Sequence, residues 1–145
     1  MHEFLLFTHI LLAIVLLGPL FLGHFVMPPI LRRGQSALPL ARFFHTMESR
    51  VAPATLLILV FGILLVEDVG FSYTDTWIWL AIVLVLVATA IGGGLIGPTE
   101  KRAIHSIETG NDASPLILRI QVLGLVNVVN LAVVLWLMVE KPGLN

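Results

Sequence analysis

The amino-acid sequence predicts an all-α integral membrane protein, a bundle of four transmembrane helices joined by two basic connectors. Three observations support this fold class. Hydrophobic residues make up 58% of the 145 residues and charged residues only 12%, which is too few charges to cover a soluble domain. Four apolar stretches have about the 20 residues that cross a bilayer core of roughly 30 Å. The basic residues gather in two of the segments between them. We therefore expect one transmembrane domain over residues 1–145.

The first helix is expected over about residues 3–27. The segment lacks the basic start and the small-residue cleavage site of a signal peptide, so we expect it to be retained. Pro19 has no N–H and should kink the helix just after Gly18. Pro28 and Pro29 should end it, because neither can continue the hydrogen-bond ladder of the backbone.

A connector over residues 28–50 leads into a second helix, expected over about residues 51–66. A helical pattern begins earlier, so this helix has a possible N-terminal extension from residue 40. Pro53 falls in the first turns of the apolar span, where a missing N–H costs little. The two acidic residues and the glycine that follow residue 66 mark the end of the helix.

The third and fourth helices follow from the same reasoning. A short polar loop, residues 70–75, precedes a third helix expected over residues 76–97, which Pro98 should end. The second connector, residues 98–114, contains a short amphipathic helix and a turn. The fourth helix is expected over residues 115–139.

Charges and aromatic residues predict the orientation. Basic residues are retained on the cytoplasmic side of a membrane, and tryptophan and tyrosine favour its interfaces. We therefore expect a multi-pass protein of the cell membrane, with both connectors in the cytoplasm and both termini outside. The connectors and their flanks hold seven of the eight basic residues, Arg32, Arg33, Arg42, Arg50, Lys101, Arg102 and Arg119, whereas the opposite side holds Lys141 with Tyr73, Trp77, Trp79 and Trp136.

Histidines are the first candidates for chemistry, because polar groups inside a bilayer are costly. His9 lies within the first helix, where it either hydrogen-bonds to a neighbouring helix, most plausibly through Asn130, or serves as an axial ligand of haem or a copper ligand. His24 lies on roughly the same side but about 22 Å along the axis, too far to share a metal with His9. His24 and His45 lie near the same end of the bundle and form a weaker candidate pair for binding a cofactor.

A second group of candidates comes from the amides and hydroxyls of the helices. Asn127 and Asn130 are three residues apart, so they share a face of the fourth helix. They either hydrogen-bond between helices, worth on the order of 0.6 kcal/mol each, or line a polar site together with His9, Thr8 and Thr89. The metal at any such site is left open, and haem b is the cofactor that we consider.

Small residues predict close helix packing. Glycines spaced four apart let neighbouring helices approach each other, and Gly93 with Gly97 in the third helix has this spacing. Gly18 and Gly23 are the matching candidates in the first helix. We expect the Gly93/Gly97 face to pack within the bundle or across an oligomer interface.

No catalytic motif emerges from the sequence. There is no paired intramembrane carboxylate, no Ser-His-Asp constellation and no phosphate loop, and every carboxylate is expected at or beyond a membrane boundary. The absence of cysteine excludes disulfides, thiolate metal sites and iron–sulfur clusters. No catalytic residue is therefore assigned, and a pump with a buried acid is disfavoured.

Three segments, residues 8–12 with Gly18, 76–79 and 135–142, resemble the domain-of-unknown-function 2269 family of small predicted integral membrane proteins. The resemblance covers nearly the whole chain and implies an architecture without an activity. The first segment is more distantly similar to the copper resistance D and HemJ-type membrane proteins, and His9 matches the histidine through which the HemJ type binds haem b. Leu17 stands where that type has tryptophan, and the third helix lacks its lysine, so the oxidase activity is not carried over.

The leading functional hypothesis from the sequence is a non-enzymatic structural or accessory subunit of a membrane complex or homo-oligomer. A haem b- or copper-binding protein using His9 is the alternative, and a small transporter is the third hypothesis. The expected partners are the lipid bilayer and other membrane subunits or further copies of the chain. Nucleic acid is not expected as a partner.

Overall fold

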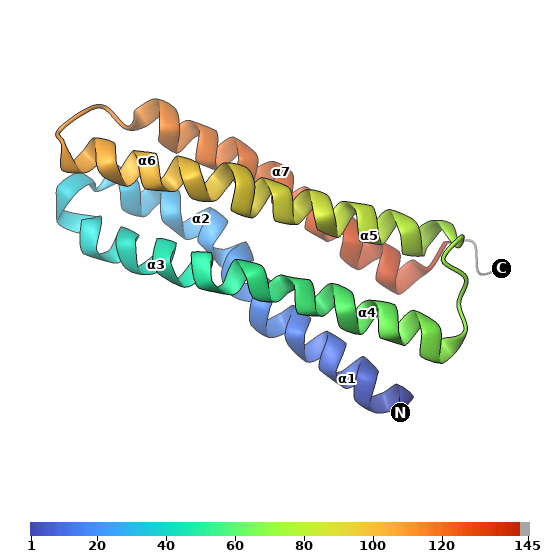
Figure 1. The fold of residues 1–145 in the computed structure, drawn as a ribbon. Helices are drawn as coiled ribbons and strands as arrows, with labels where there is room; N and C mark the ends of the chain where they lie inside the picture. Colours follow the sequence, from blue (N-terminus) through green and yellow to red (C-terminus); the bar gives the residue numbers. More distant parts are fainter. Residues whose placement is uncertain (143–145) are drawn as a thin grey trace.

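Long helices make up nearly all of the described chain. A computed structural model describes residues 1–142, and this part of the chain contains no strand. The predicted fold class is confirmed: the protein is an all-α integral membrane protein (Figure 1). Within residues 1–142, the four helical segments that are long and apolar enough to cross a membrane are His2–Arg32, Gly34–Val69, Thr76–Glu108 and Ser114–Glu140.

The first segment is longer than expected. It consists of α1 (His2–Leu12), a π-helical stretch η1 (Ala13–Leu17) and α2 (Gly18–Arg32). The π-helical stretch ends at Leu17, two residues before Pro19, and the kink expected at Pro19 stays a prediction. The expectation that Pro28 and Pro29 end the helix is wrong, since α2 continues to Arg32. Pro28 is fully buried, and α2 packs on two other helices, contacts that offset the ~3 kcal/mol cost of an interior proline.

The second segment also starts earlier and ends later than predicted. It comprises a short 3₁₀ turn η2 (Gly34–Ala37), α3 (Leu38–Val51), a second 3₁₀ turn η3 (Ala52–Thr55) and α4 (Leu56–Val69). The predicted extension from residue 40 therefore begins at Leu38. Gly70 ends the helix in the left-handed conformation, with φ of 80°, which glycine adopts without steric cost.

The third segment corrects a further expectation. Its parts are α5 (Thr76–Thr89), a π-helical stretch η4 (Ala90–Ile96) and α6 (Gly97–Glu108), so Pro98 does not end the helix. Pro98 instead occupies the first turn of α6, which directly follows the π-helical stretch η4 within the same continuous segment. The fourth helix, α7 (Ser114–Glu140), agrees with the predicted span within one residue at each end.

The bundle differs between its two ends (Figure 1). At the end bearing the connectors, α2 packs on α3 and α7, and α6 packs on the same two helices, which closes a four-helix bundle. Toward the termini, α1 packs on α4 and α5 packs on α7, with few contacts between these two pairs. A small cluster that includes Val66, Trp77 and Leu137 joins the pairs beside the loop between α4 and α5.

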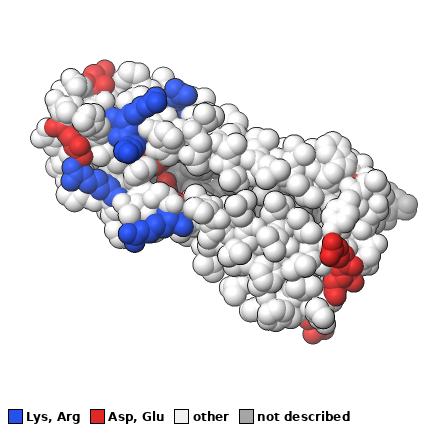
Figure 2. Space-filling model, in the orientation of Figure 1, with Lys and Arg blue, Asp and Glu red and all other residues white. Residues whose placement is uncertain are grey.

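Charged residues occupy the two ends of the rod. On the face shown in Figure 2, lysine and arginine lie only at the α3/α6 end, and the other end shows acidic atoms. Arg42 on α3 forms an ion pair with Glu108 on α6, and the Arg32 guanidinium donates a hydrogen bond of 2.8 Å to the Gln121 side chain. These polar contacts tie the closed end of the bundle together across helices.

Candidate functional site: a cavity at the helix breaks

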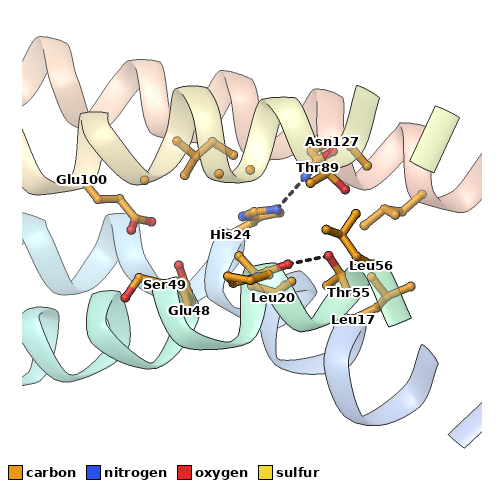
Figure 3. A pocket seen from close by; sticks show the side chains of 18 of the residues that line it. Leu17, Leu20, His24, Glu48, Ser49, Thr55, Leu56, Thr89, Glu100 and Asn127 are labelled. Carbon is orange, nitrogen blue, oxygen red and sulfur yellow. Dashed lines mark hydrogen bonds between the residues drawn. The ribbon is translucent and has the colours of Figure 1, made fainter. Parts of the chain in front are cut away.

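A cavity of about 660 Å³ lies where three of the four segments depart from regular α-helix. The turn η3, the π-helical stretch η4 and the residues that flank η1 all contribute to its walls. Figure 2 shows the molecular surface hollowed between the two halves of the bundle near its middle. Figure 3 shows the side chains that project into this space. The walls are mainly apolar, with Leu17, Leu20, Leu56, Ile58, Val85 and Leu131 among the lining residues.

The sequence explains why space remains at this level. Prolines and glycines follow one another in the broken segments, and glycine brings no side chain to fill the interior. Gly92, Gly93 and Gly97 line the cavity. A Cβ added at Gly93 would meet no atom within 4 Å. The prediction that the Gly93/Gly97 face packs tightly inside the bundle is therefore wrong, because Gly93 borders open space; its role at an oligomer interface stays a prediction.

The tight glycine contacts occur at other positions. A Cβ at Gly23 would lie 1.8 Å from Glu48 Oε1, and one at Gly124 would lie 3.1 Å from His24 Cβ. Gly18 has nothing within 4 Å of such a Cβ. Because Gly23 and Gly124 have no side chains, Glu48 and His24, two polar residues of the cavity, have room beside the backbone. Gly124 was not singled out from the sequence, because an isolated glycine carries no spacing signal.

One polar group of the cavity joins α2 to α7. His24 Nε2 and Asn127 Nδ2 are 3.1 Å apart and hydrogen-bonded, and His24 and Asn127 are 8% and 4% exposed. The second polar atoms of these side chains, His24 Nδ1 and Asn127 Oδ1, have no hydrogen-bond partner within the described residues. Thr89 also lines the cavity, but its hydroxyl donates to the Val85 carbonyl of its own helix.

A second polar group consists of two carboxylates and a histidine. His45 Nδ1 lies 3.0 Å from Glu100 Oε2. Glu100 is only 1% exposed and Glu48 only 8%, and Oε1 of each carboxylate is without a hydrogen-bond partner in the described chain. Both side chains point into the cavity from opposite sides, Glu48 from α3 and Glu100 from α6 (Figure 3). The burial of this pair inside the bundle was not predicted from the sequence, and the expectation that every carboxylate lies at or beyond a membrane boundary stays a prediction.

The predicted site around His9 has a different geometry. His9 Nδ1 lies 3.0 Å from the Ile58 carbonyl oxygen and so links α1 to α4. Asn130, the expected partner of His9, instead donates to the Leu84 carbonyl at 2.8 Å. The Thr8 hydroxyl donates to the Phe4 carbonyl within α1. Neither His9 nor Thr8 lines the cavity. The polar set expected from the sequence is therefore divided, and only Asn127 and Thr89 face the interior space.

The two weaker histidine candidates, His24 and His45, both line the cavity. They do not form one centre, because His24 is bonded to Asn127 and His45 to Glu100. Within residues 1–142, no group of three or more histidine, cysteine, aspartate or glutamate side chains has the geometry to hold a metal ion. The cavity offers instead several separate hydrogen-bonding atoms set in an apolar wall.

These features define an α-helical integral membrane protein with an interior cavity. A family model described as a predicted integral membrane protein, domain of unknown function 2269, matches residues 3–142, and the chain belongs to that family. No curated protein and no solved structure is similar enough to the chain to count as a match. The first resemblance drawn from the sequence is thus confirmed, and these comparisons give no support to the more distant one with the copper resistance D and HemJ types.

Proposed function

We propose that this protein is a non-enzymatic membrane protein that binds a small amphipathic molecule in its central cavity. The observation that carries the proposal is the cavity itself. Its volume of about 660 Å³ falls within the roughly 300–1,000 Å³ of sites that enclose small ligands, and such sites combine apolar walls with a few convergent polar atoms. The lining residues match that description.

The unpaired polar atoms support the same proposal. A buried donor or acceptor without a partner costs about 1–3 kcal/mol. Four such atoms belong to side chains that line the cavity, namely Oε1 of Glu48 and Glu100, Nδ1 of His24 and Oδ1 of Asn127. A bound molecule with polar groups of its own would satisfy such atoms once small rotations of these side chains turn them toward the cavity.

Transport of the ligand is a second candidate function, favoured by one specific observation. Binding sites of many transporters lie where transmembrane helices are interrupted. Here three of the four segments change helix type beside the cavity. The positive-inside rule would place the carboxylate end of the cavity toward the cytoplasm and both termini outside the cell membrane.

The other hypotheses from the sequence remain proposals with less support. An accessory or self-associating subunit needs an apolar outer surface, and lipid accounts for that surface equally well. Haem b or copper at His9 would bind through Nε2, because Nδ1 donates to the Ile58 carbonyl, a contact that both ligating and structural histidines make. His9 does not line the cavity, so a cofactor there would be separate from the proposed binding site.

Photolabelling tests the proposed binding. The probe is para-(hydroxymethyl)benzophenone, a neutral molecule that inserts into nearby C–H bonds on illumination. In wild-type protein in lipid nanodiscs, we expect saturable labelling of wall residues such as Leu131. Gly93→Phe places a ring in the open space beside Gly93 and should abolish that labelling. Gly94→Phe is the matched control, because Gly94 is adjacent in sequence, has nothing near its Cβ and does not line the cavity.

Peptide mass spectrometry then decides the outcome. Labelling of wall residues in wild type and in Gly94→Phe, but not in Gly93→Phe, supports binding in the cavity. Labels confined to lipid-facing residues, or cavity labelling that is unchanged by Gly93→Phe, would contradict the proposed function.

A further inference from the structure

We propose that the ligand is an organic cation, an amphipathic primary or secondary amine whose ammonium group binds between Glu48 and Glu100. This inference rests on the proposed function and names the chemical class of its ligand. The apolar body of the amine would lie along the leucine-rich wall toward Asn127.

The carboxylates of Glu48 and Glu100 approach the same space from α3 and α6 (Figure 3), and both residues are more than nine-tenths buried. Burial removes the water that would solvate their charges, so each needs protein or ligand partners. One oxygen of each carboxylate has none within the described residues. Both residues line a cavity large enough for a ligand, and a small rotation of either carboxyl group would turn this shielded acceptor toward it.

Few positive groups lie near Glu48 and Glu100. The titratable side chains that line the cavity are His24 on α2, His45 and Glu48 on α3, and Glu100 and Lys101 on α6. Of these, only His45 lies within ion-pair distance of a carboxylate, Glu100, in the part of the chain that the structure describes. Two adjacent buried carboxylates repel each other unless one of them is protonated or a positive group lies beside them. An ammonium supplies both that charge and several N–H donors.

A second polar group in the same cavity, separate from the acidic pair, also has unpartnered atoms. His24 Nδ1 and Asn127 Oδ1 are buried and have no hydrogen-bond partner within the described residues. They point to a ligand that extends past the carboxylates. The leucines of the cavity wall provide an apolar surface for its body. A bare metal cation fits less well, because no cluster of three suitable ligands exists among residues 1–142.

The position of the Glu48 carboxylate also depends on a neighbouring glycine. The 1.8 Å contact that a Cβ at Gly23 would make with Glu48 Oε1 leaves room for no side chain there. Gly23→Ala should therefore push the carboxylate out of its place without changing any charge. This variant therefore tests whether amine binding depends on the position of the carboxylate when its charge is kept.

The experiment compares three benzophenones that differ in one para substituent, namely aminomethyl, hydroxymethyl and carboxy groups. In wild-type protein, the amine should label the cavity at about ten-fold lower concentration than the alcohol, because its hydrogen bonds to carboxylates are charge-assisted. The carboxylate probe should label least. Glu48→Gln, Glu100→Gln and Gly23→Ala should each reduce the preference for the amine to about two-fold or less, whereas Glu140→Gln, at the far end of α7, should leave it unchanged.

Labelling by the alcohol is measured in every variant and reports whether the cavity persists. If a variant is labelled by neither the amine nor the alcohol, it has lost the cavity. The preference for the amine is then measured in the other glutamine variant. Equal labelling of wild type by amine and alcohol, still blocked by Gly93→Phe, would overturn the cation inference and leave the proposed function standing. The same holds if the amine preference survives in both glutamine variants. If Gly93→Phe reduces cavity labelling by none of the three probes, the proposed function itself is overturned.

Discussion

Two glutamates and the residues beside them determine the chemistry of the cavity. Glu100 lies on the buried face of α6 with Ala103 and Ile107, three and seven residues further on, and the buried Ile96 at the end of η4 precedes it by four residues. Helical periodicity therefore contained a signal for its burial. Glu48 lies three residues after His45 on the same face of α3. The position of both glutamates along the chain predicts the membrane boundary, whereas the helix face on which each lies predicts burial.

The hydrogen bond of His9 was expected from the sequence, but its partner was not. An interhelical hydrogen bond at His9 was one of its two alternatives, and the structure contains such a bond. The partner was not predicted, because it is a backbone carbonyl of α4, and every residue carries one. Partners of this kind depend on how the helices are rotated against each other, which the helical period of one segment does not specify.

Substitution of His9 tests its role in holding α1 against α4. His9→Gln keeps a donor that can reach the Ile58 carbonyl, so thermal stability in detergent should change little. His9→Leu removes the donor and should cost about 0.6 kcal/mol and at most about 1.7 kcal/mol, as for other hydrogen bonds between transmembrane helices. Bound haem in wild-type protein that disappears in a stably folded His9→Gln would contradict the structural role and support an axial ligand.

Interrupted helices account for most differences between the predicted and observed elements. Proline was taken as a stop signal at Pro28 and Pro98, yet both positions lie within continuous helical segments. The rule reflects the cost of one lost hydrogen bond and a local clash. Burial of Pro28 and the π-helical stretch before Pro98 offset this cost. Apolar length, which depends on no tertiary contact, predicted the number of spans correctly.

Glycine contacts provide a prediction about helix packing. At Gly124, an added Cβ would lie only 3.1 Å from His24 Cβ on α2, which leaves no room for a larger side chain, so Gly124→Leu should lower the unfolding free energy by about 1–3 kcal/mol. At Gly93 there is open space, so Gly93→Leu should leave stability nearly unchanged. Thermal unfolding of the two variants in the same detergent makes the comparison. A larger loss for Gly93→Leu would favour the tight packing face expected from the sequence.

The whole molecule combines a closed bundle at one end with two separate helix pairs at the other. The sequence predicted four helices and the segregation of charge between the ends. It did not predict the cavity, because that space results from three helix breaks that meet at one level, and their relative depth depends on how the segments are packed.

Orientation in the membrane is testable at this scale. Alkaline phosphatase is active outside the cytoplasm, and green fluorescent protein fluoresces within it. A phosphatase fused to the C-terminus should be active, and fluorescent protein inserted at Gly110, an exposed turn with φ of 74°, should fluoresce. Fluorescence of a C-terminal fusion would reverse the proposed topology and place the carboxylate end of the cavity on the outer side.

Protection of a single introduced cysteine reports directly whether a cation binds at the carboxylate pair, since the chain has no cysteine of its own. Ser49 lines the cavity beside Glu48, whereas Ser36 is exposed elsewhere on the same segment. With the aminomethyl benzophenone bound in the dark, alkylation of Ser49→Cys by N-ethylmaleimide should slow about ten-fold, as expected at roughly ninety per cent occupancy. Alkylation of Ser36→Cys should not change. Equal alkylation rates of Ser49→Cys with and without the amine would contradict a ligand at this carboxylate pair.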